Sequence, residues 1–288
     1  MNTRRHILAA ALVVALVSLS CGINLPVTQI KTGPTQKVDL QVSMPKEPAA
    51  NVELTLEFGA GELKLAPGAK DFLASGTATF NVAELEPNVD VSGSSYTLSQ
   101  GDLKVKGIPR VQGDFINKWD VQLANTPMSL NIKAGAYTGN FELGGLSLER
   151  LTITDGGADL TTTFSTANHV DMSSFIYSTG ASSAKLNGLA NANFEQMTFN
   201  SGAGDYTLRF DGKLQRDAKV TIEAGAGNVN IIIPEGVPAQ LTFDGALTTV
   251  NADNGWSKNG NLYALSGSGP MITITVKMAA GTLNLKTR

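Results

Sequence analysis

Hydrophobic and polar residues alternate along most of the chain, and this alternation recurs with a long period. Two apolar residues separated by one polar residue precede each Gly-rich stretch, and a second apolar set follows it. Alternation with a period of two predicts a β-strand with one buried face. The apolar pairs are Leu130/Ile132, Leu151/Ile153, Phe175/Tyr177, Met197/Phe199, Val220/Ile222, Leu241/Phe243 and Tyr263/Leu265.

These pairs follow one another at steps of 21, 24, 22, 23, 21 and 22 residues. Short strands repeating at such a step, joined by Gly-rich corners, predict a parallel β-solenoid in which each coil buries its inward residues against the next. We therefore expect an all-β, β-helix-like solenoid over residues 128–288, with about 22 residues per coil. Outward Thr and Asn residues are expected to form like-with-like ladders between the coils.

The Gly-rich stretches, such as SGAGDYTLRF at residues 201–210, also suggest nucleotide or calcium binding. A dinucleotide-binding loop needs G-x-G-x-x-G followed by a helix, whereas a strand pattern follows here. A calcium-binding β-roll needs tandem nine-residue repeats, and these turns recur at about 22 residues. We interpret the stretches as corners, where glycine permits a sharp bend, and expect no cofactor.

The N-terminal residues 1–20 have the pattern of a signal peptide. Arg4 and Arg5 precede an apolar run, Ile7–Leu19, which is too short to span a membrane. Cys21 is the only cysteine and follows the small Ser20, so we expect it to be lipidated after export and to anchor the protein to a membrane. The alternative is ordinary signal-peptidase cleavage, which would leave Cys21 unmodified at the mature N-terminus. Either way, an extracytoplasmic location in a bacterial envelope is predicted.

Two regions separate the signal peptide from the solenoid. Residues 21–50 are rich in Pro, Thr and Lys and predict a tether with one edge strand around Val38, Leu40 and Val42. Residues 51–127 predict an N-terminal β region that caps the solenoid, because exposed strand edges recruit other chains. Its strand-like runs are Val52–Leu65, Leu73–Asn81, Val89–Gln100 and Trp119–Leu123.

Several short motifs spread over most of residues 50–243 resemble the toast-rack N-terminal domain of bacterial envelope proteins. They are Leu56-x-Phe58-Gly59-Ala60-Gly61-Glu62-Leu63, Phe80-Asn81, Glu86-Pro87-x-Val89, Asn117-x-Trp119, Asn125-x-Pro127, Leu130-x-Ile132, Gly135-Ala136, Gly188-Leu189-Ala190-Asn191-Ala192-x-Phe194, Gly202-Ala203-Gly204-Asp205 and Ile233-Pro234. The solenoid half is also similar to adhesin-type and cell-wall-active antibiotics response domains. The tail after Phe243 departs from the pattern. The resemblance implies a role in surface adhesion or envelope-stress regulation and carries over no catalytic residues.

Charge and candidate ligands narrow the functions further. The net charge of −3 and the lack of any long Lys/Arg cluster exclude nucleic acid as a partner. With His169 as the only histidine after residue 20, no metal site of nitrogen and sulfur ligands can form within one chain. We interpret His169 as a corner or surface residue. Asp159 and Asp205 are expected two coils apart, at or just past the separation that an inverting glycosidase uses.

The sequence therefore predicts an exported, lipid-anchored, non-catalytic scaffold that binds an envelope protein or a glycan. The alternative is an extracytoplasmic sensor or regulator of envelope stress, and a polysaccharide-acting β-helix enzyme is the third hypothesis. Thr207, Asn230, Trp256 and Tyr263 form the candidate binding surface, with an exposed Trp256 as an anchor. The sequence leaves the oligomeric state and the specific partner open.

Overall fold

The structure is a computed structural model that describes residues 27–46, 51–104 and 108–288. Regular structure in this part of the chain is almost entirely β-strand, which confirms the all-β prediction. Two short 3-10 helices are also present, η1 (Ala83–Leu85) and η2 (Leu189–Ala192). The predicted signal peptide, residues 1–20, and the predicted lipidation site, Cys21, lie outside the described residues.

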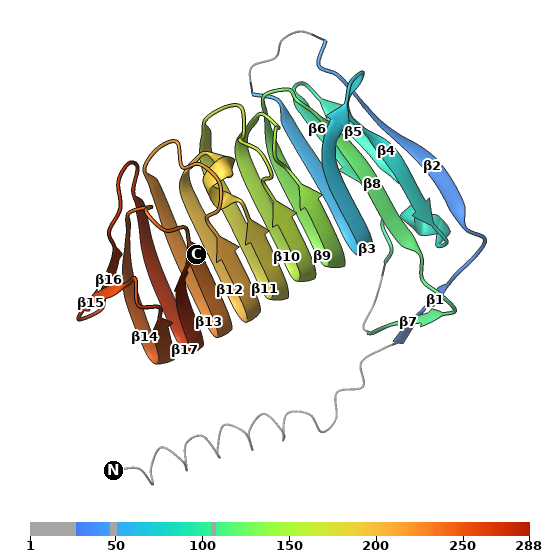
Figure 1. Cartoon of the computed structure of the whole chain (residues 1–288). Coiled ribbons are helices and arrows are strands. Elements are labelled where there is room, and N and C mark those ends of the chain that lie inside the picture. The colour runs from blue at the N-terminus through green and yellow to red at the C-terminus, as the bar shows by residue number, and fades with distance from the viewer. Residues whose placement is uncertain (1–26, 47–50, 105–107) are drawn as a thin grey trace.

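Long strands lie side by side across the whole molecule (Figure 1), and we refer to each of them as a rung. Their order in the sheet is β3-β9-β10-β11-β12-β13-β17-β14, and each rung pairs with its neighbours in parallel. Each rung bends near its middle, so the sheet has a first and a second arm. The rungs are β3 (Glu53–Ala69), β9 (Met128–Glu142), β10 (Leu148–Thr163), β11 (Met172–Asn187), β12 (Phe194–Arg209), β13 (Ala218–Ile233), β14 (Ala239–Ala252) and β17 (Ile272–Thr287).

The register between rungs explains the recurring apolar pairs. On the first arm, the first residues of five predicted pairs pair in sequence across the sheet, from Leu130 through Leu151, Phe175 and Met197 to Val220. All five side chains are buried. Because every rung places its apolar residues at the same height, each inward side chain packs between like neighbours on both sides.

The last two steps of the predicted repeat are wrong. Val220 pairs with Ile274 of the C-terminal rung β17, and Ile274 in turn pairs with Leu241 of β14. Tyr263 belongs to β16 (Leu262–Leu265), which runs antiparallel to β14 and forms a hairpin with β15 (Ser257–Asn259). The chain thus inserts its final strand between two earlier ones. The physical reason is burial, because β17 buries apolar residues on both arms and needs a neighbour on each side, whereas no residue of the second arm of β14 is buried.

The core lies between the two arms and is rich in aromatic rings. Tyr177, Phe199 and Tyr206 form a chain of edge-to-face contacts, with ring centroids 5.3 Å and 5.0 Å apart. Aromatic pairs of this geometry add about 0.5–1.5 kcal/mol each beyond simple burial. Near the N-terminal end, Phe58 meets Trp119 edge to face at 5.3 Å. The Phe58–Trp119 contact joins two strands that are distant in the sequence.

The N-terminal end of the stack is covered by shorter strands. The first arm of β3 pairs with β6 (Ser95–Ser99), which forms a hairpin with β5 (Asn88–Ser92). Its second arm pairs with β8 (Asn117–Ala124), followed by β4 (Phe72–Phe80) and β2 (Gln36–Ser43). The residues 51–127 predicted to form strands therefore extend the same sheet.

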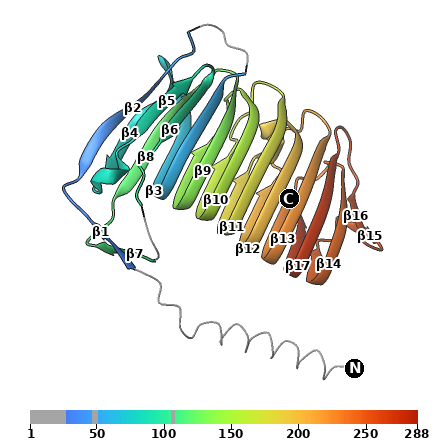
Figure 2. The same ribbon diagram turned by 180° about the vertical axis from the view of Figure 1, so that it is seen from behind.

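The segment predicted as a tether contains more structure than expected over its described residues. The edge strand predicted around Val38, Leu40 and Val42 is present as β2. In addition, β1 (Val27–Lys31) pairs in parallel with β7 (Ile108–Gln112) as a separate two-stranded sheet. Seen from behind, β1 and β7 lie at the opposite end of the molecule from β14 (Figure 2).

Candidate functional site

The bend of the rungs is built from backbone packed against backbone. A Cβ atom on Gly180 would lie 2.5 Å from the carbonyl oxygen of Gly156, and one on Gly202 would lie 2.4 Å from that of Gly180. A Cβ atom on Gly225 would likewise lie 2.4 Å from the carbonyl oxygen of Gly202. Carbon and oxygen atoms do not approach this closely without a shift of the chain. Glycine is therefore required here for close approach, and it leaves the outer side of the bend bare of side chains.

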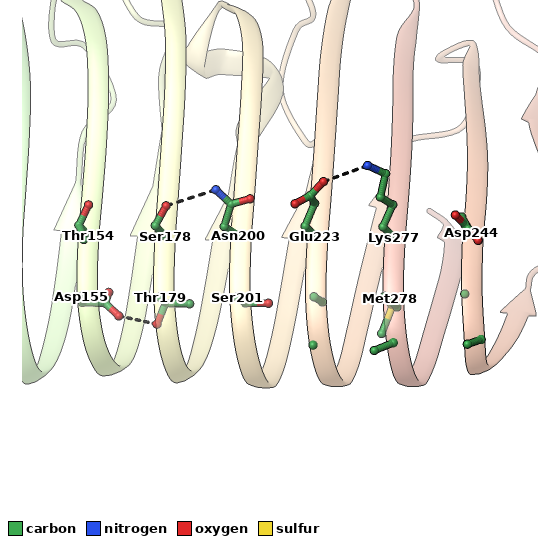
Figure 3. A pocket seen from close by; sticks show the side chains of 15 residues that line it. Thr154, Asp155, Ser178, Thr179, Asn200, Ser201, Glu223, Asp244, Lys277 and Met278 are labelled. Atoms are coloured by element: carbon green, nitrogen blue, oxygen red, sulfur yellow. Dashed lines mark hydrogen bonds and ion pairs between the residues drawn. The ribbon is translucent and has the colours of Figure 1, made fainter.

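A row of polar side chains lies beside this bend on the outer face of the first arm (Figure 3). It arises because the register places one residue of each rung at the same height, directly after the buried apolar pair. An open cavity of about 760 Å³ runs along this row, and we call it the corner groove. The row consists of Thr154, Ser178, Asn200, Glu223, Lys277 and Asp244.

The row changes from neutral to charged along the stack. The Asn200 Nδ2 donates a hydrogen bond to the Ser178 Oγ at 3.4 Å, in the neutral part. Farther along, the Lys277 Nζ lies 3.1 Å from the Glu223 Oε1, and Asp244 follows as the next residue of the row. Because both partners of this ion pair are exposed, it contributes little to stability, and its charges remain available to a ligand.

The groove continues toward the N-terminal end. A second cavity of about 680 Å³ shares Thr154 with the first and extends over β9 and β3. It is lined by Lys133 and Glu57, which form another ion pair at 3.0 Å, and by the apolar Phe58 and Phe115. The two cavities together follow the bend over most of the rungs, so the site is long and narrow.

Asp155 faces the inside of the bend and is 7% exposed. Its Oδ1 accepts hydrogen bonds from the Thr179 Oγ1 at 2.5 Å and the Ser182 Oγ at 3.3 Å, and its Oδ2 accepts one from the Tyr137 hydroxyl at 3.3 Å. Burial raises the pKa of Asp155 above its ordinary value, while hydrogen bonds from Thr179, Ser182 and Tyr137 oppose part of that rise. Burial likewise raises the pKa of Tyr137. The floor of the groove therefore holds one carboxyl group that is deeply embedded among hydroxyls.

The structure brings two of the four predicted binding residues together. Thr207 and Asn230 pair across β12 and β13 on the outer face of the second arm. The ladder continues where sequence reasoning missed it, because the Asn284 Nδ2 donates to the Asn230 Oδ1 at 2.9 Å and the Asn251 Nδ2 donates to the Asn284 Oδ1 at 3.0 Å. This confirms the expected ladders of like residues. The available signal was the Asn directly after an inward residue in NVNI and TLNL, at Asn230 and Asn284.

The other two predicted binding residues are buried. Trp256 is 7% exposed and Tyr263 is 4% exposed, so the expected exposed anchor at Trp256 is wrong. Both rings belong to the hydrophobic core, next to the last rung. The physical reason is that the end of the stack needs apolar cover, and the large Trp and Tyr rings supply it. Neither ring lies with Thr207 and Asn230.

The remaining candidate residues lie apart from the groove. His169 is exposed, and its Nδ1 lies 2.8 Å from the Asn125 Nδ2. Asp159 and Asp205 both pair with Ser183 and are thus two rungs apart, as the sequence predicts. Within residues 27–46, 51–104 and 108–288, no group of three His, Cys, Asp or Glu side chains could hold a metal ion. In the same residues, no helix has the length and hydropathy needed to cross a membrane.

Comparison with known sequences identifies one family. The sequence model described as the N-terminal domain of toast_rack, DUF2154, matches residues 31–176 and 173–232. Together these ranges cover 202 of the 288 residues, from 31 to 232. The match confirms the resemblance drawn from the short motifs. A comparison with curated proteins gives no match.

Several solved structures align with most of this chain. A candidate cell adhesion protein from Clostridium sporogenes is 19% identical, with a TM-score of 0.49, and the alignment covers 88% of this chain and 100% of that one. A candidate lipid-binding protein from Parabacteroides distasonis is 12% identical, with a TM-score of 0.43 and coverage of 90% and 100%. A candidate adhesin from Bacteroides fragilis is 12% identical, with a TM-score of 0.38 and coverage of 91% and 100%.

Proposed function

Because the chain belongs to the toast_rack N-terminal domain family, we propose that it is an exported, lipid-anchored envelope protein that acts as a non-catalytic binding scaffold. Its rungs form a β-solenoid of about 22 residues per coil, and its ligand is an extended polar polymer of the envelope, such as a glycan. The corner groove is the binding site. Export and anchoring rest on the sequence of residues 1–21.

The observation that carries this proposal is the row of polar side chains along a groove that crosses successive rungs. Neighbouring strands lie about 4.8 Å apart, so the row presents a polar group at each such interval. A polymer with regularly repeated hydroxyl or amide groups can contact several rungs at once. Individually weak hydrogen bonds then add up along the chain, which is the advantage of multivalent binding.

The chemistry of the groove favours binding over hydrolysis. A glycosidase needs two carboxyl groups on opposite sides of one bond, one as acid and one as base or nucleophile. In the groove, Glu223 is paired with Lys277, and Lys277 also separates Glu223 from Asp244 in the row. Asp155 is enclosed by three hydroxyl groups. These groups supply donors and acceptors for recognition.

The proposal is tested by blocking the groove and measuring binding to purified envelope polysaccharide and cell wall. Asn200→Tyr places a bulky ring in the middle of the row, and co-sedimentation with the insoluble wall fraction should fall by about tenfold or more, the equivalent of roughly 1.4 kcal/mol. The matched control is Asn230→Tyr, the same change at a half-exposed residue of the second arm. Binding that survives Asn200→Tyr but is lost in Asn230→Tyr would place the site on the second-arm ladder instead.

A crosslinking experiment in cells separates this function from the sensor alternative. A photo-reactive residue at Ser178 or Asn200 samples the groove, and one at Thr207 samples the second arm. Capture of glycan or cell wall from the groove positions supports the scaffold. Capture of a signalling membrane protein from the same positions would instead support the sensor of envelope stress.

A further inference from the structure

The row of side chains directly inside the bend changes character in the middle of the stack. It is apolar on β3 and β9 and again on β13 and β17, at Phe58, Ala134, Ala224 and Met278. The three consecutive rungs between them, β10, β11 and β12, carry Asp155, Thr179 and Ser201 in this row (Figure 3). All three polar residues line the corner groove. Because polar groups are costly at an inward position unless they have partners, this break in the pattern indicates a binding role.

Asp155 is a buried carboxyl group without a positively charged partner. It is 7% exposed, and among the ion pairs of the described residues none includes Asp155. Its hydrogen bonds come from the neutral hydroxyl groups of Thr179, Ser182 and Tyr137. Buried charges in proteins are normally paired with an opposite charge or bound to a metal ion. A ligand that brings a positive charge into the groove would supply this partner.

Two buried oxygen atoms close to Asp155 have no hydrogen-bond partner among the described residues. They are the hydroxyl of Tyr177, a fully buried residue, and the Ser201 Oγ. Ser201 pairs with Thr179 on one side of β11, and Asp155 pairs with Thr179 on the other. Burial, and after it the negative charge of Asp155, raises the pKa of Tyr177, so the Tyr177 hydroxyl lies near that carboxyl group. An ammonium group has three N–H donors and no acceptor, which complements a carboxylate flanked by free oxygen atoms.

The charge along the groove also favours a cationic ligand. The two lysines that line its cavities lie in ion pairs, Lys133 with Glu57 and Lys277 with Glu223. Three further acidic residues line the cavities and form no ion pair within the described part of the chain, and these are Asp102, Asp155 and Asp244. The groove therefore carries an excess of negative charge, which attracts cationic ligands and repels anionic ones.

We propose that the polymer bound in the corner groove is a glycan with free, protonated amino groups, and that Asp155 binds one of these ammonium groups. This inference rests on the proposed function and narrows its ligand. The Ser201 Oγ accepts a second N–H of the same ammonium group. Thr154, Ser178 and Asn200, each next to one of the three polar residues inside the bend, bind the sugar hydroxyls. Acetylation of the amino group removes the positive charge, and an acidic glycan is repelled, so the groove selects its polymer by charge.

The test is calorimetric titration of the chain carrying Cys21→Ser with two oligosaccharides of equal length, one of glucosamine and one of N-acetylglucosamine. Near neutral pH, the glucosamine oligomer should bind about tenfold or more tightly, and this preference should shrink as the salt concentration rises. Asp155→Asn keeps the size of the side chain and removes its charge, so it should abolish the preference. Ser201→Ala is a second variant that leaves the buried carboxyl group in place, and it should reduce the preference about threefold.

The matched control is Asp159→Asn, because Asp159 is an exposed carboxylate on the second arm of the same rung as Asp155. This variant should keep the full preference. A wild-type chain that binds the two oligomers equally, or binds neither, would overturn the inference. The proposed function would still stand if Asn200→Tyr lowered binding to the cell wall.

Two other results would also contradict the inference. A lysine peptide of the same charge that binds as tightly as the glucosamine oligomer would show that the groove recognises charge without recognising an amino sugar. A preference that both Asp155→Asn and Ser201→Ala leave unchanged would show that the ammonium group binds elsewhere.

Discussion

Replacing one glycine of the bend tests whether close backbone packing holds the rungs together. In Gly202→Ala, the new Cβ would lie 2.4 Å from the Gly180 carbonyl oxygen, whereas an ordinary contact begins at about 3.4 Å. The two rungs must therefore move apart by about 1 Å at the bend. A hydrogen bond of about 2.9 Å is largely lost after such a shift, at about 0.5–1.5 kcal/mol for each bond. Overpacking adds about 1–3 kcal/mol, so the free energy of unfolding should fall by about 2–4 kcal/mol.

The assay is equilibrium unfolding in urea, with the midpoint and slope compared between variants. The matched control is Gly33→Ala, because a Cβ there would lie 3.7 Å from the Asn81 carbonyl oxygen, an ordinary contact. That variant should equal the wild type or exceed it by about 0.4–1 kcal/mol, since alanine reduces the entropy of the unfolded chain. A Gly202→Ala protein as stable as the Gly33→Ala control would refute the account of the bend.

Three further changes have definite expected results. Burial raises the pKa of Asp155, so the folded protein holds the Asp155 proton more tightly than the unfolded chain does. The stabilisation that this proton provides is fully present below the ordinary carboxyl pKa and is lost as the pH rises through the raised pKa. Between these two pKa values, the free energy of unfolding of the wild type should therefore fall relative to that of Asp155→Asn, by at most about 1.4 kcal/mol per pH unit. A difference between the urea midpoints of the two proteins that stays constant at all pH values would contradict this. Phe199→Ala should cost about 3–5 kcal/mol in the same assay, and Phe243→Ala, half-buried on the last rung, should cost clearly less. Cys21→Ser should release the protein from membranes on fractionation, whereas continued tight association would contradict lipid anchoring.

Much of the stack could be predicted from the order of residues alone. The pairs from Leu130/Ile132 to Val220/Ile222 recur because each inward position must be apolar, and each corner must admit a bend. The residue after each pair, such as Thr154, Ser178 or Asn200, is polar because it faces outward. Local patterns of this kind depend on burial of single residues, so they are visible without knowing which strands are neighbours.

The order of the last rungs was decided only by the tertiary structure. The step from Val220 to Leu241 continues the period, yet β17 lies between these two strands. Which strand takes an interior place depends on how much apolar surface each buries against two neighbours, and this is a comparison between distant segments. The burial of Trp256 follows from the same arrangement, because the end of the core must be covered.

The sequence by itself determined the strand type, the inward and outward faces, the glycine corners and the family. The tertiary structure decided that Thr154, Ser178, Asn200, Glu223 and Lys277 form one row along a groove, and that Asp155 lies embedded beneath it. The physical reason is that alternation specifies the face of a strand on which a side chain lies. Only the pairing of strands, with its register and its bend, specifies which side chains of different strands become neighbours.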